Sequence, residues 1–248
     1  MMFKNKKNKI DFSNVPKHVA FIMDGNGRWA NKKGLPRTMG HKAGAETLFS
    51  IVDIAKHMGI KAITVYAFST ENWKRSKDEI DYIFKLLEKT LDEKKEDLKR
   101  NDIQIRIMGD LNRLIGEYDS LKSKMEEVVE YSKSNNGIIL NIAFNYGGKD
   151  EIINATKKIA MDVKNNNLSV DKINEELFES YLMTNGLPKI DLMIRTSGEK
   201  RISNFLLWQL AYSEMIFTST YWPDFDEEEL SKCIIEYQKR DRRFGNVK

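Results

Sequence analysis

The stretch of sequence that decides the fold is HVAFIMDGNGRW, residues 18–29. Its five apolar residues, 19–23, include Val and Ile and are followed by turn-forming residues, which is typical of a strand buried on both faces. Asp24 stands where this strand opens into a loop. Ligands of open α/β sheets bind at the carboxyl ends of the strands, so Asp24 occupies the expected position of a binding site.

The rest of the chain alternates short β-branched runs with longer stretches of helical periodicity. The runs are Ala62 to Phe68, Ile103 to Met108, Gly137 to Phe144 and Ile190 to Ile194. This alternation predicts an α/β fold with a central, mostly parallel β-sheet surrounded by helices. No Pro/Gly-rich linker or internal repeat divides the chain, so we expect one domain over residues 16–248. Residues 1–15 are a basic N-terminal tail, expected to fray or to touch an anionic lipid surface.

Three helices can be placed from the sequence. One follows Ser76, because apolar residues recur every three or four positions between Ile80 and Leu91. A second is predicted from about Arg113 to Tyr131. A third begins near Asp226, whose position before three glutamates suits a capped helix N-terminus.

Composition excludes several classes of protein. The 41 Lys and Arg residues exceed the 37 Asp and Glu residues only slightly, so the charge does not indicate a nucleic-acid partner. The single cysteine, Cys233, cannot form an internal disulfide and is expected in the core of a protein from a reducing compartment. No apolar run approaches the roughly 20 residues of a membrane span, and the N-terminus lacks the apolar stretch of a signal peptide. We therefore expect a cytoplasmic protein.

Polar clusters follow three of the predicted strands. Gly25 and Gly27 can take positive φ and let main-chain N–H groups approach a ligand, as in a phosphate-binding nest. Side chains that can donate hydrogen bonds to an anion lie near these loops: Arg28, Arg37, His41, Arg75, Arg195 and Arg201. Each arginine alone could pair with a surface acid. Gathered at strand ends, they favour a site for a polyanion.

The carboxylate of Asp24 has two interpretations among these cations. It is either a structural counter-ion or a ligand of Mg²⁺, which diphosphates commonly bring and which binds one or two carboxylates plus phosphate oxygens. Glu214, near the end of the apolar segment FLLWQLAYSEMIF, is a candidate second ligand. On the sequence alone, an acid in that position is more often a cap or a surface residue.

Six blocks of the sequence resemble the signature motifs of the cis-prenyltransferases, specifically those of the bacterial undecaprenyl diphosphate synthases. The blocks read MDGNGRWA, GHKAGA, AFSTENWKR, IRTSGEKRISNFLLWQLAYSE, YWPDF and RRFG. They occur in the family's order between residues 18 and 245 and so cover nearly the whole chain. The sequence lacks the DDxxD motif of the all-helical trans-prenyltransferases.

The resemblance implies a fold, an activity and partners. The fold is a single α/β domain with an apolar tunnel for the growing chain. The reaction adds isopentenyl diphosphate repeatedly to an allylic diphosphate, usually farnesyl diphosphate, and creates cis double bonds. The product expected is undecaprenyl diphosphate, the lipid-carrier precursor for cell-wall peptidoglycan synthesis. A homodimer is implied, with Arg243 and Gly245 reaching the partner's active site, and product release at the membrane surface is expected.

The resemblance also assigns roles to matching residues. Asp24 is the essential acid that holds Mg²⁺ at a substrate diphosphate, and Glu214 completes the ligation. The allylic diphosphate site corresponds to Gly25, Asn26, Gly27, Arg28, Arg37 and His41. The isopentenyl diphosphate site corresponds to Arg195, Arg201 and Ser203, with Ile202 as a further substrate-binding residue. Arg75 lies beside the reacting pair, and its loop adds Ser69, Thr70, Glu71 and Trp73. Trp29 and Trp73 either cover the isoprenoid or only pack.

The roles of two residues, Asn72 and Ala67, have two interpretations each. The family assigns Asn72 the role of proton acceptor, but a neutral carboxamide is a very weak base, so Asn72 could instead position substrate while a diphosphate oxygen or water takes the proton. Ala67 shares a strand face with Ile63 and Val65 and is either a tight helix–sheet contact or part of the channel wall that sets product length. In the second case the helix from Ile80 to Leu91 forms the opposite wall.

The sequence departs from the family motifs at two positions, and it also differs from two rival classes of protein. Ser197 stands where some members have glycine and Lys200 where some have histidine, and both keep the loop polar. A phosphatase of the haloacid dehalogenase type needs a second acid where this chain has Asn26. A non-catalytic partner subunit would lack the functional residues, whereas Asp24, Arg28, Asn72 and Glu214 are all present.

Overall fold

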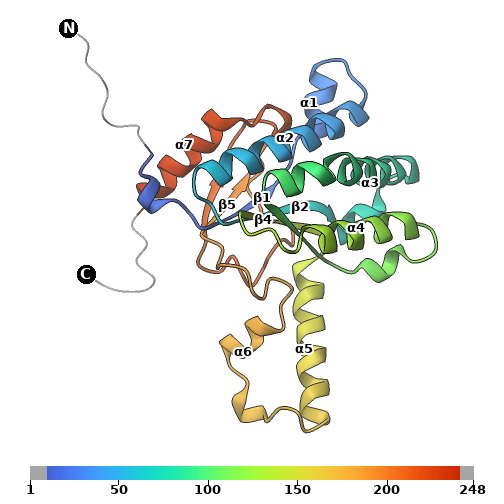
Figure 1. Cartoon of the computed structure of the whole chain (residues 1–248), viewed down its shortest axis with the longest axis vertical. Helices are drawn as coiled ribbons and strands as arrows, with labels where there is room; N and C mark the ends of the chain where they lie inside the picture. Colours follow the sequence, from blue (N-terminus) through green and yellow to red (C-terminus); the bar gives the residue numbers. More distant parts are fainter. Residues whose placement is uncertain (1–9, 241–248) are drawn as a thin grey trace.

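The computed structural model describes residues 10–240, which form an α/β fold around one six-stranded sheet (Figure 1). The strands are β1 (His18–Ile22), β2 (Ala62–Ser69), β3 (Ile103–Met108), β4 (Ile138–Tyr146), β5 (Leu192–Arg195) and β6 (Glu214–Phe217). Their order in the sheet is β3-β4-β2-β1-β5-β6, and every neighbouring pair is parallel. The predicted parallel sheet is confirmed, and β1, the strand quoted first, lies inside it.

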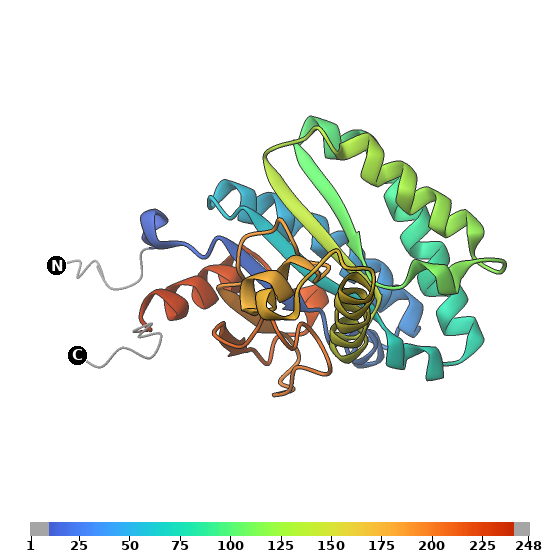
Figure 2. The same cartoon turned by 90° about the horizontal axis from the view of Figure 1, so that it is seen from below.

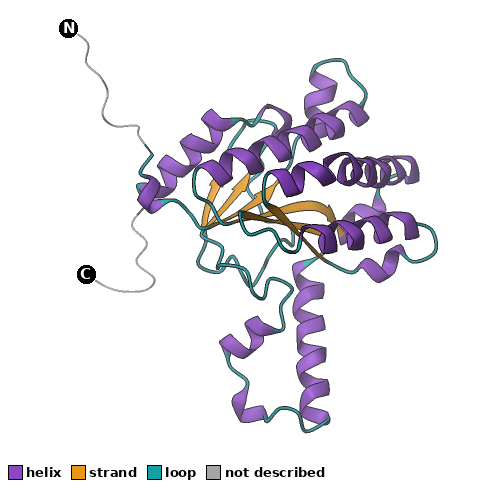
Figure 3. Ribbon diagram, in the orientation of Figure 1, coloured by secondary structure: helices purple, strands orange, loops and turns teal. Residues whose placement is uncertain are grey.

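The described residues form seven α-helices, of which α1–α6 lie between strands and α7 follows β6 (Figure 3). They are α1 (Asn26–Lys32), α2 (Arg37–His57), α3 (Lys77–Arg100), α4 (Asp119–Ser132), α5 (Gly148–Lys164), α6 (Glu175–Ser180) and α7 (Glu227–Gln238). Helices α2, α3, α4 and α7 lie together over one face of the sheet, whereas α5 and α6 project away from it as an arm (Figure 1). In Figure 2 the arm is seen from below, along the axis of α5.

The apolar core has two layers, one on each face of the sheet. The larger layer packs buried strand residues such as Phe21 and Val65 against helix residues such as Phe84 and Leu230. The smaller layer, on the other face, is covered mainly by the segment 182–210 rather than by long helices. The strands β1 and β5 are therefore buried on both faces, as the continuous apolar run in β1 predicts, whereas the edge strands β3 and β6 are partly exposed.

Helix starts follow the capping residues that the sequence offers. Ser76 caps α3 by accepting a hydrogen bond from the backbone of Glu79, and Asp226 caps α7 through Glu229. The predicted helix from Arg113 to Tyr131 is wrong at its start, because Leu111–Leu114 form a short 3₁₀-helix and α4 begins only at Asp119. Gly116, at a φ of +94°, separates the two elements.

A bulge near the end of β2 breaks the alternation of its side chains. The register with β4 shifts between Tyr66 and Phe68, so Phe68 joins the same core layer as Ile63 and Val65, and Ala67 packs against that layer too. Tyr66 packs in the opposite layer. The predicted placement of Ala67 on the helix-covered face of the sheet is confirmed.

Two further expectations concern burial and the membrane. Cys233 lies on the buried side of α7, 4% exposed, as predicted for a core residue. Across residues 10–240, no helix combines the length and the apolarity needed to cross a bilayer.

Candidate active site

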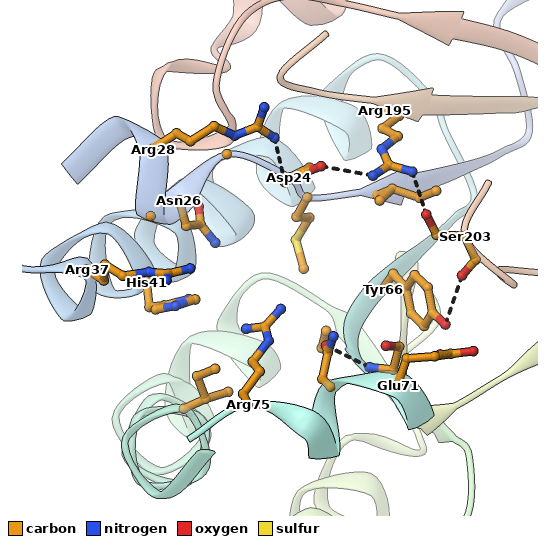
Figure 4. Close-up of a pocket in the computed structure, with 18 of the residues that line it drawn as sticks. Asp24, Asn26, Arg28, Arg37, His41, Tyr66, Glu71, Arg75, Arg195 and Ser203 are labelled. Carbon is orange, nitrogen blue, oxygen red and sulfur yellow. Dashed lines mark hydrogen bonds and ion pairs between the residues drawn. The ribbon is translucent and has the colours of Figure 1, made fainter. Parts of the chain in front are cut away.

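A polar cavity of about 690 Å³ lies at the carboxyl ends of β1, β2 and β5. The predicted site residues that line it are Asp24, Gly25, Asn26, Gly27, Arg28, Arg37, His41, Ser69, Glu71, Asn72, Arg75, Arg195, Arg201 and Ser203. In Figure 4, Asp24, Arg28 and Arg195 lie on one side of this cavity and Arg75 and Glu71 on the opposite side. The fold thus brings together Asp24 and Arg195, which are 171 residues apart in the sequence.

Asp24 is clamped between two arginines. Its Oδ1 accepts a hydrogen bond from Arg28 Nη2 at 3.1 Å, and its Oδ2 accepts one from Arg195 Nη2 at 2.9 Å. Burial alone would raise the pKa of Asp24, but the hydrogen bonds and positive charges of Arg195 and Arg28 outweigh it and lower the pKa. The carboxylate is therefore ionised at neutral pH.

Arg195 is the buried cation of the site, with 4% of its surface exposed. Its Nη1 donates to Ser203 Oγ at 2.8 Å and to the backbone oxygen of Arg201. Its Nε is buried and has no hydrogen-bond partner among the described residues. The guanidinium thus links Asp24 to the loop that carries Arg201 and Ser203.

Arg28 is held on the rim by the loop after β5. Its Nη2 donates to Ser197 Oγ at 2.6 Å, and its Nη1 donates to Glu199 Oε1 at 3.0 Å. Arg201 Nη1 donates to the other oxygen of Glu199 at 2.5 Å. One carboxylate therefore joins two arginines that the sequence assigned to different diphosphates.

Asn72 uses its amide oxygen inside its own loop. The backbone N–H of Ser69 donates to Asn72 Oδ1 at 3.1 Å, which forms one half of a capping box at the start of the 3₁₀-helix Thr70–Lys74. The oxygen that a proton would have to reach is therefore already bonded to the main chain.

A smaller apolar pocket continues from the polar cavity between the sheet and helices α2 and α3. Its volume is about 110 Å³, and its lining includes Leu48, Phe49, Ala67, Ile83, Leu86, Leu87, Leu91, Ile142 and Phe144. Residues shared by both linings are Met23, Asn26, His41, Ala67 and Ile83. The structure therefore has an apolar space next to the cationic groups, at the predicted position of the tunnel.

Comparison with known proteins assigns this arrangement to a family. The family model described as "Putative undecaprenyl diphosphate synthase" matches residues 22–245. The chain is a member of this family. A Clostridium perfringens protein named isoprenyl transferase is 49% identical over 94% of this chain and 91% of its own length. A Pasteurella multocida protein named ditrans,polycis-undecaprenyl-diphosphate synthase is 46% identical over 96% of this chain and 98% of its own. The chain is thus a prenyl transferase.

Two solved structures of similar sequence share the fold. The crystal structure of lavandulyl diphosphate synthase from Lavandula x intermedia, in complex with dimethylallyl diphosphate, has a TM-score of 0.89 and 38% identity, covering 94% of this chain and 99% of that one. A probable undecaprenyl diphosphate synthase from Campylobacter jejuni has a TM-score of 0.77 and 36% identity, covering 94% and 100%. The predicted architecture and resemblance are confirmed.

Some residues assigned from the undecaprenyl diphosphate synthase motifs line neither the polar cavity nor the apolar pocket. Trp29 donates to Asp224 Oδ1 at 2.6 Å, and Trp73 donates to Asn145 Oδ1 at 2.7 Å while its ring packs edge-on against Phe68. The structure thus favours the packing interpretation of Trp73, which packs against the larger core layer. Thr70 lines a neighbouring cavity of about 230 Å³, and Ile202 packs against the smaller core layer.

Glu214 is not brought to Asp24 within one chain. Leu192 pairs with both Val19 and Glu214, so Glu214 lies at the amino end of the sheet, about 15 Å from Asp24 along the strand direction. Its Oε2 accepts a hydrogen bond from Arg240 Nη1 at 2.7 Å. In this chain the carboxylate is therefore engaged in an ion pair away from the cavity.

The cavity also contains residues that the sequence analysis did not single out. Tyr66 lines it, stacks on Phe205 with ring centroids 4.5 Å apart, and donates to the backbone oxygen of Tyr146 at 3.1 Å. Asn204 lines it and donates to Glu71 Oε1 at 2.9 Å. Tyr66 precedes Ala67 in the sequence and Asn204 follows Ser203. This adjacency to predicted site residues is the one feature of the sequence that could have indicated their place in the cavity.

Proposed function

We propose that this prenyl transferase adds isopentenyl diphosphate repeatedly to farnesyl diphosphate and makes undecaprenyl diphosphate, the precursor of a lipid carrier for cell-wall synthesis. The observation that supports the proposal is that the polar cavity and the apolar pocket meet at Ala67. A cavity with cationic groups on several sides opens there beside an apolar pocket. A prenyl diphosphate has the same two-part chemistry. The dimethylallyl diphosphate bound by the lavender relative supports an allylic primer.

The cationic side chains supply electrostatic catalysis. Breaking the allylic C–O bond leaves negative charge on the departing diphosphate, and Arg28, Arg37 and His41 are placed to stabilise that charge. Arg195, Arg201 and Ser203, which also line the cavity, suit the second diphosphate. Because preorganised donors act on charge that develops in the transition state, they lower the barrier more than they tighten ground-state binding.

The added isopentenyl unit must lose a proton. The bond between Asn72 Oδ1 and the Ser69 N–H supports the alternative in which Asn72 positions substrate. A diphosphate oxygen or a water molecule then accepts the proton, since an engaged carboxamide oxygen is an even weaker base than a free one.

Magnesium is proposed as the cofactor, with Asp24 as its protein ligand. Over residues 10–240, no group of three or more His, Cys, Asp or Glu side chains is arranged to hold a metal ion. Magnesium nevertheless commonly binds through one or two carboxylates plus substrate phosphates and water, so a single ionised carboxylate at a diphosphate cavity fits its needs. When bound, the ion would neutralise charge on the leaving diphosphate.

A homodimer is proposed on the basis of the exposed arm. Side chains of Ile153, Met161, Val170 and Ile173, on α5 and the segment up to α6, are 42–63% exposed, and a second copy of the chain would cover them. Arg243 and Gly245, expected to reach the partner's site, lie outside the described residues, as does most of the basic tail.

Contact with a membrane surface during product release completes the proposal, because a long polyprenyl product is insoluble in water.

The proposal is tested by incubating the pure protein with farnesyl diphosphate, radiolabelled isopentenyl diphosphate and Mg²⁺. Chain elongation to the undecaprenyl length is expected, with no incorporation when the metal is chelated. Absence of elongation would reject the proposed reaction, and a shorter product would reject the product length alone.

A further inference from the structure

Glu79 contacts two arginines and one histidine of the cavity with one carboxylate oxygen. Its Oε1 lies 3.1 Å from Arg75 Nη1, 3.7 Å from His41 Nε2 and 3.9 Å from Arg37 Nη2. None of the sequence motifs assigned a role to this residue. Arg37 and His41 come from the first turns of α2, Arg75 follows the 3₁₀-helix after β2, and Glu79 lies in the first turn of α3. The carboxylate therefore ties three separate elements together.

The position of Glu79 shows from which side it acts. Arg37, His41 and Arg75 all line the polar cavity, but Glu79 is not part of the lining. Its side chain is 19% exposed. The carboxylate thus contacts the cations from behind and leaves their cavity side available to a ligand.

The electrostatic reason for such a group is direct. The guanidinium groups of Arg37 and Arg75 repel each other, and an adjacent carboxylate offsets that repulsion. Burial lowers the pKa of His41, the charges of Arg75 and Arg37 lower it further, and the charge of Glu79 opposes them. His41 Nε2 is also buried with no hydrogen-bond partner among the residues described.

We propose that Glu79 is a positioning residue that holds Arg37, His41 and Arg75 in the arrangement that receives the allylic diphosphate. The identity of that ligand rests on the proposed function. In a different role, Glu79 would compete with the diphosphate for the same side chains. That role predicts that removing the carboxylate lowers KM for the allylic diphosphate, whereas positioning predicts that it raises KM. The position of the carboxylate behind the cavity favours positioning.

The test compares Glu79→Gln with a matched control, Asp78→Asn. Both remove one negative charge from the first turn of α3, but Asp78 is exposed. Glu79→Gln is expected to raise KM for farnesyl diphosphate about tenfold, while KM for isopentenyl diphosphate and kcat change less than about threefold. Asp78→Asn is expected to change none of these, and thermal unfolding should show that both variants fold. An unchanged or lowered KM for farnesyl diphosphate in folded Glu79→Gln overturns the inference.

A second readout reports on the same contacts without turnover. The pKa of His41, followed by NMR titration, should fall in Glu79→Gln because the opposing charge is lost while Arg37 and Arg75 remain. An unchanged titration would show that the carboxylate does not act on His41 and would count against the inference.

Inorganic pyrophosphate separates this inference from the proposed function. If the unaltered enzyme fails to elongate farnesyl diphosphate, the proposed reaction fails, but calorimetry with pyrophosphate still measures the anion site. Weaker pyrophosphate binding by Glu79→Gln than by Asp78→Asn supports the positioning role. Equal binding by the two variants, or no binding by the unaltered enzyme, overturns it.

Discussion

Ser197 Oγ accepts a hydrogen bond from Arg28 Nη2 at 2.6 Å, and the backbone of Ser197 lies at a φ of +74°. A residue with a Cβ atom is held in this left-handed region at a cost of about 1–2 kcal/mol. The surrounding structure maintains it, since the backbone N–H of Ser197 donates to the oxygen of Thr220 at 2.8 Å. The hydroxyl–guanidinium contact is thus obtained at the expense of backbone strain.

Replacing Ser197 should separate stability from activity. Ser197→Gly relieves the strained φ and is expected to raise the free energy of unfolding by about 1 kcal/mol. The same change removes the contact to Arg28 and should lower kcat/KM for the allylic substrate about tenfold. Urea denaturation and steady-state kinetics measure the two effects.

Two companion variants control for these opposing effects. Ser197→Ala removes the hydroxyl but keeps the Cβ, so activity should fall without a gain in stability. Asn166→Gly relieves a φ of +60° just after α5 and should leave activity unchanged. Full activity in both Ser197 variants would show that the hydroxyl does not position Arg28.

Asp24→Ala is expected to lower kcat by about 100-fold or more, the scale of losing one preorganised electrostatic contact. Stability should fall as well, because Arg195 is buried and loses the carboxylate that accepts its Nη2 hydrogen bond. Asp24→Asn keeps an oxygen acceptor and should recover part of the stability but not the activity. Near-normal turnover of either variant would remove Asp24 from the mechanism.

The lowered pKa of Asp24 makes its contribution to stability depend on pH in a defined direction. Because the folded-state pKa lies below the unfolded-state pKa, the contribution is fully present above the unfolded value. It is lost as the pH falls through the folded value. The difference in free energy of unfolding between the unaltered protein and Asp24→Ala should be constant near neutral pH and should shrink on acidification. A difference that grows on acidification would contradict the clamped geometry.

Product length should respond to the two walls of the apolar pocket in opposite directions. Ala67→Leu adds bulk where the polar cavity meets the pocket and should shorten the polyprenyl diphosphates while leaving the first condensation mostly intact. Ile83→Ala removes bulk from α3 on the facing wall and should lengthen them. Chromatography of the products decides, and an unchanged length distribution from both folded, active variants would place the channel elsewhere.

Deleting residues 243–248 tests the predicted role of the C-terminal segment. If Arg243 and Gly245 reach the partner's active site, the truncated enzyme should remain a dimer by analytical ultracentrifugation but lose most of its activity. A fully active truncated dimer would reject the role of these residues in the partner's site but would leave the proposed homodimer intact.

The sequence predicted those parts of the molecule that depend on local pattern. The buried run before Asp24, the β-branched runs and the caps at Ser76 and Asp226 each carry their signal within a few residues. The cations that follow predicted strand ends also converge as expected, because parallel strands place their carboxyl ends at one edge.

Other parts depend on contacts that no local pattern contains. Glu79 meets Arg37 and His41 only because α2 and α3 pack side by side, and before folding it is one of many acids on a polar helix. Trp29 and Trp73 carry the same apolar surface whether they pack or bind a ligand. Glu214 shares a motif with Arg195 and Arg201, but it lies at the opposite end of the sheet from Asp24. The order of the motifs along the chain does not contain that distance.

The position of β1 inside the sheet has a consequence for synthesis on the ribosome. β1 is the first strand of the described residues, and it pairs with β2 on one side and with β5, at residues 192–195, on the other. One edge of β1 therefore stays unpaired until β5 has been translated, which begins 170 residues after the end of β1. Parallel pairing between such distant segments forms slowly, and an open edge invites association with other nascent chains. The same central strand that presents Asp24 thus exposes the incomplete chain to association until β5 pairs with it.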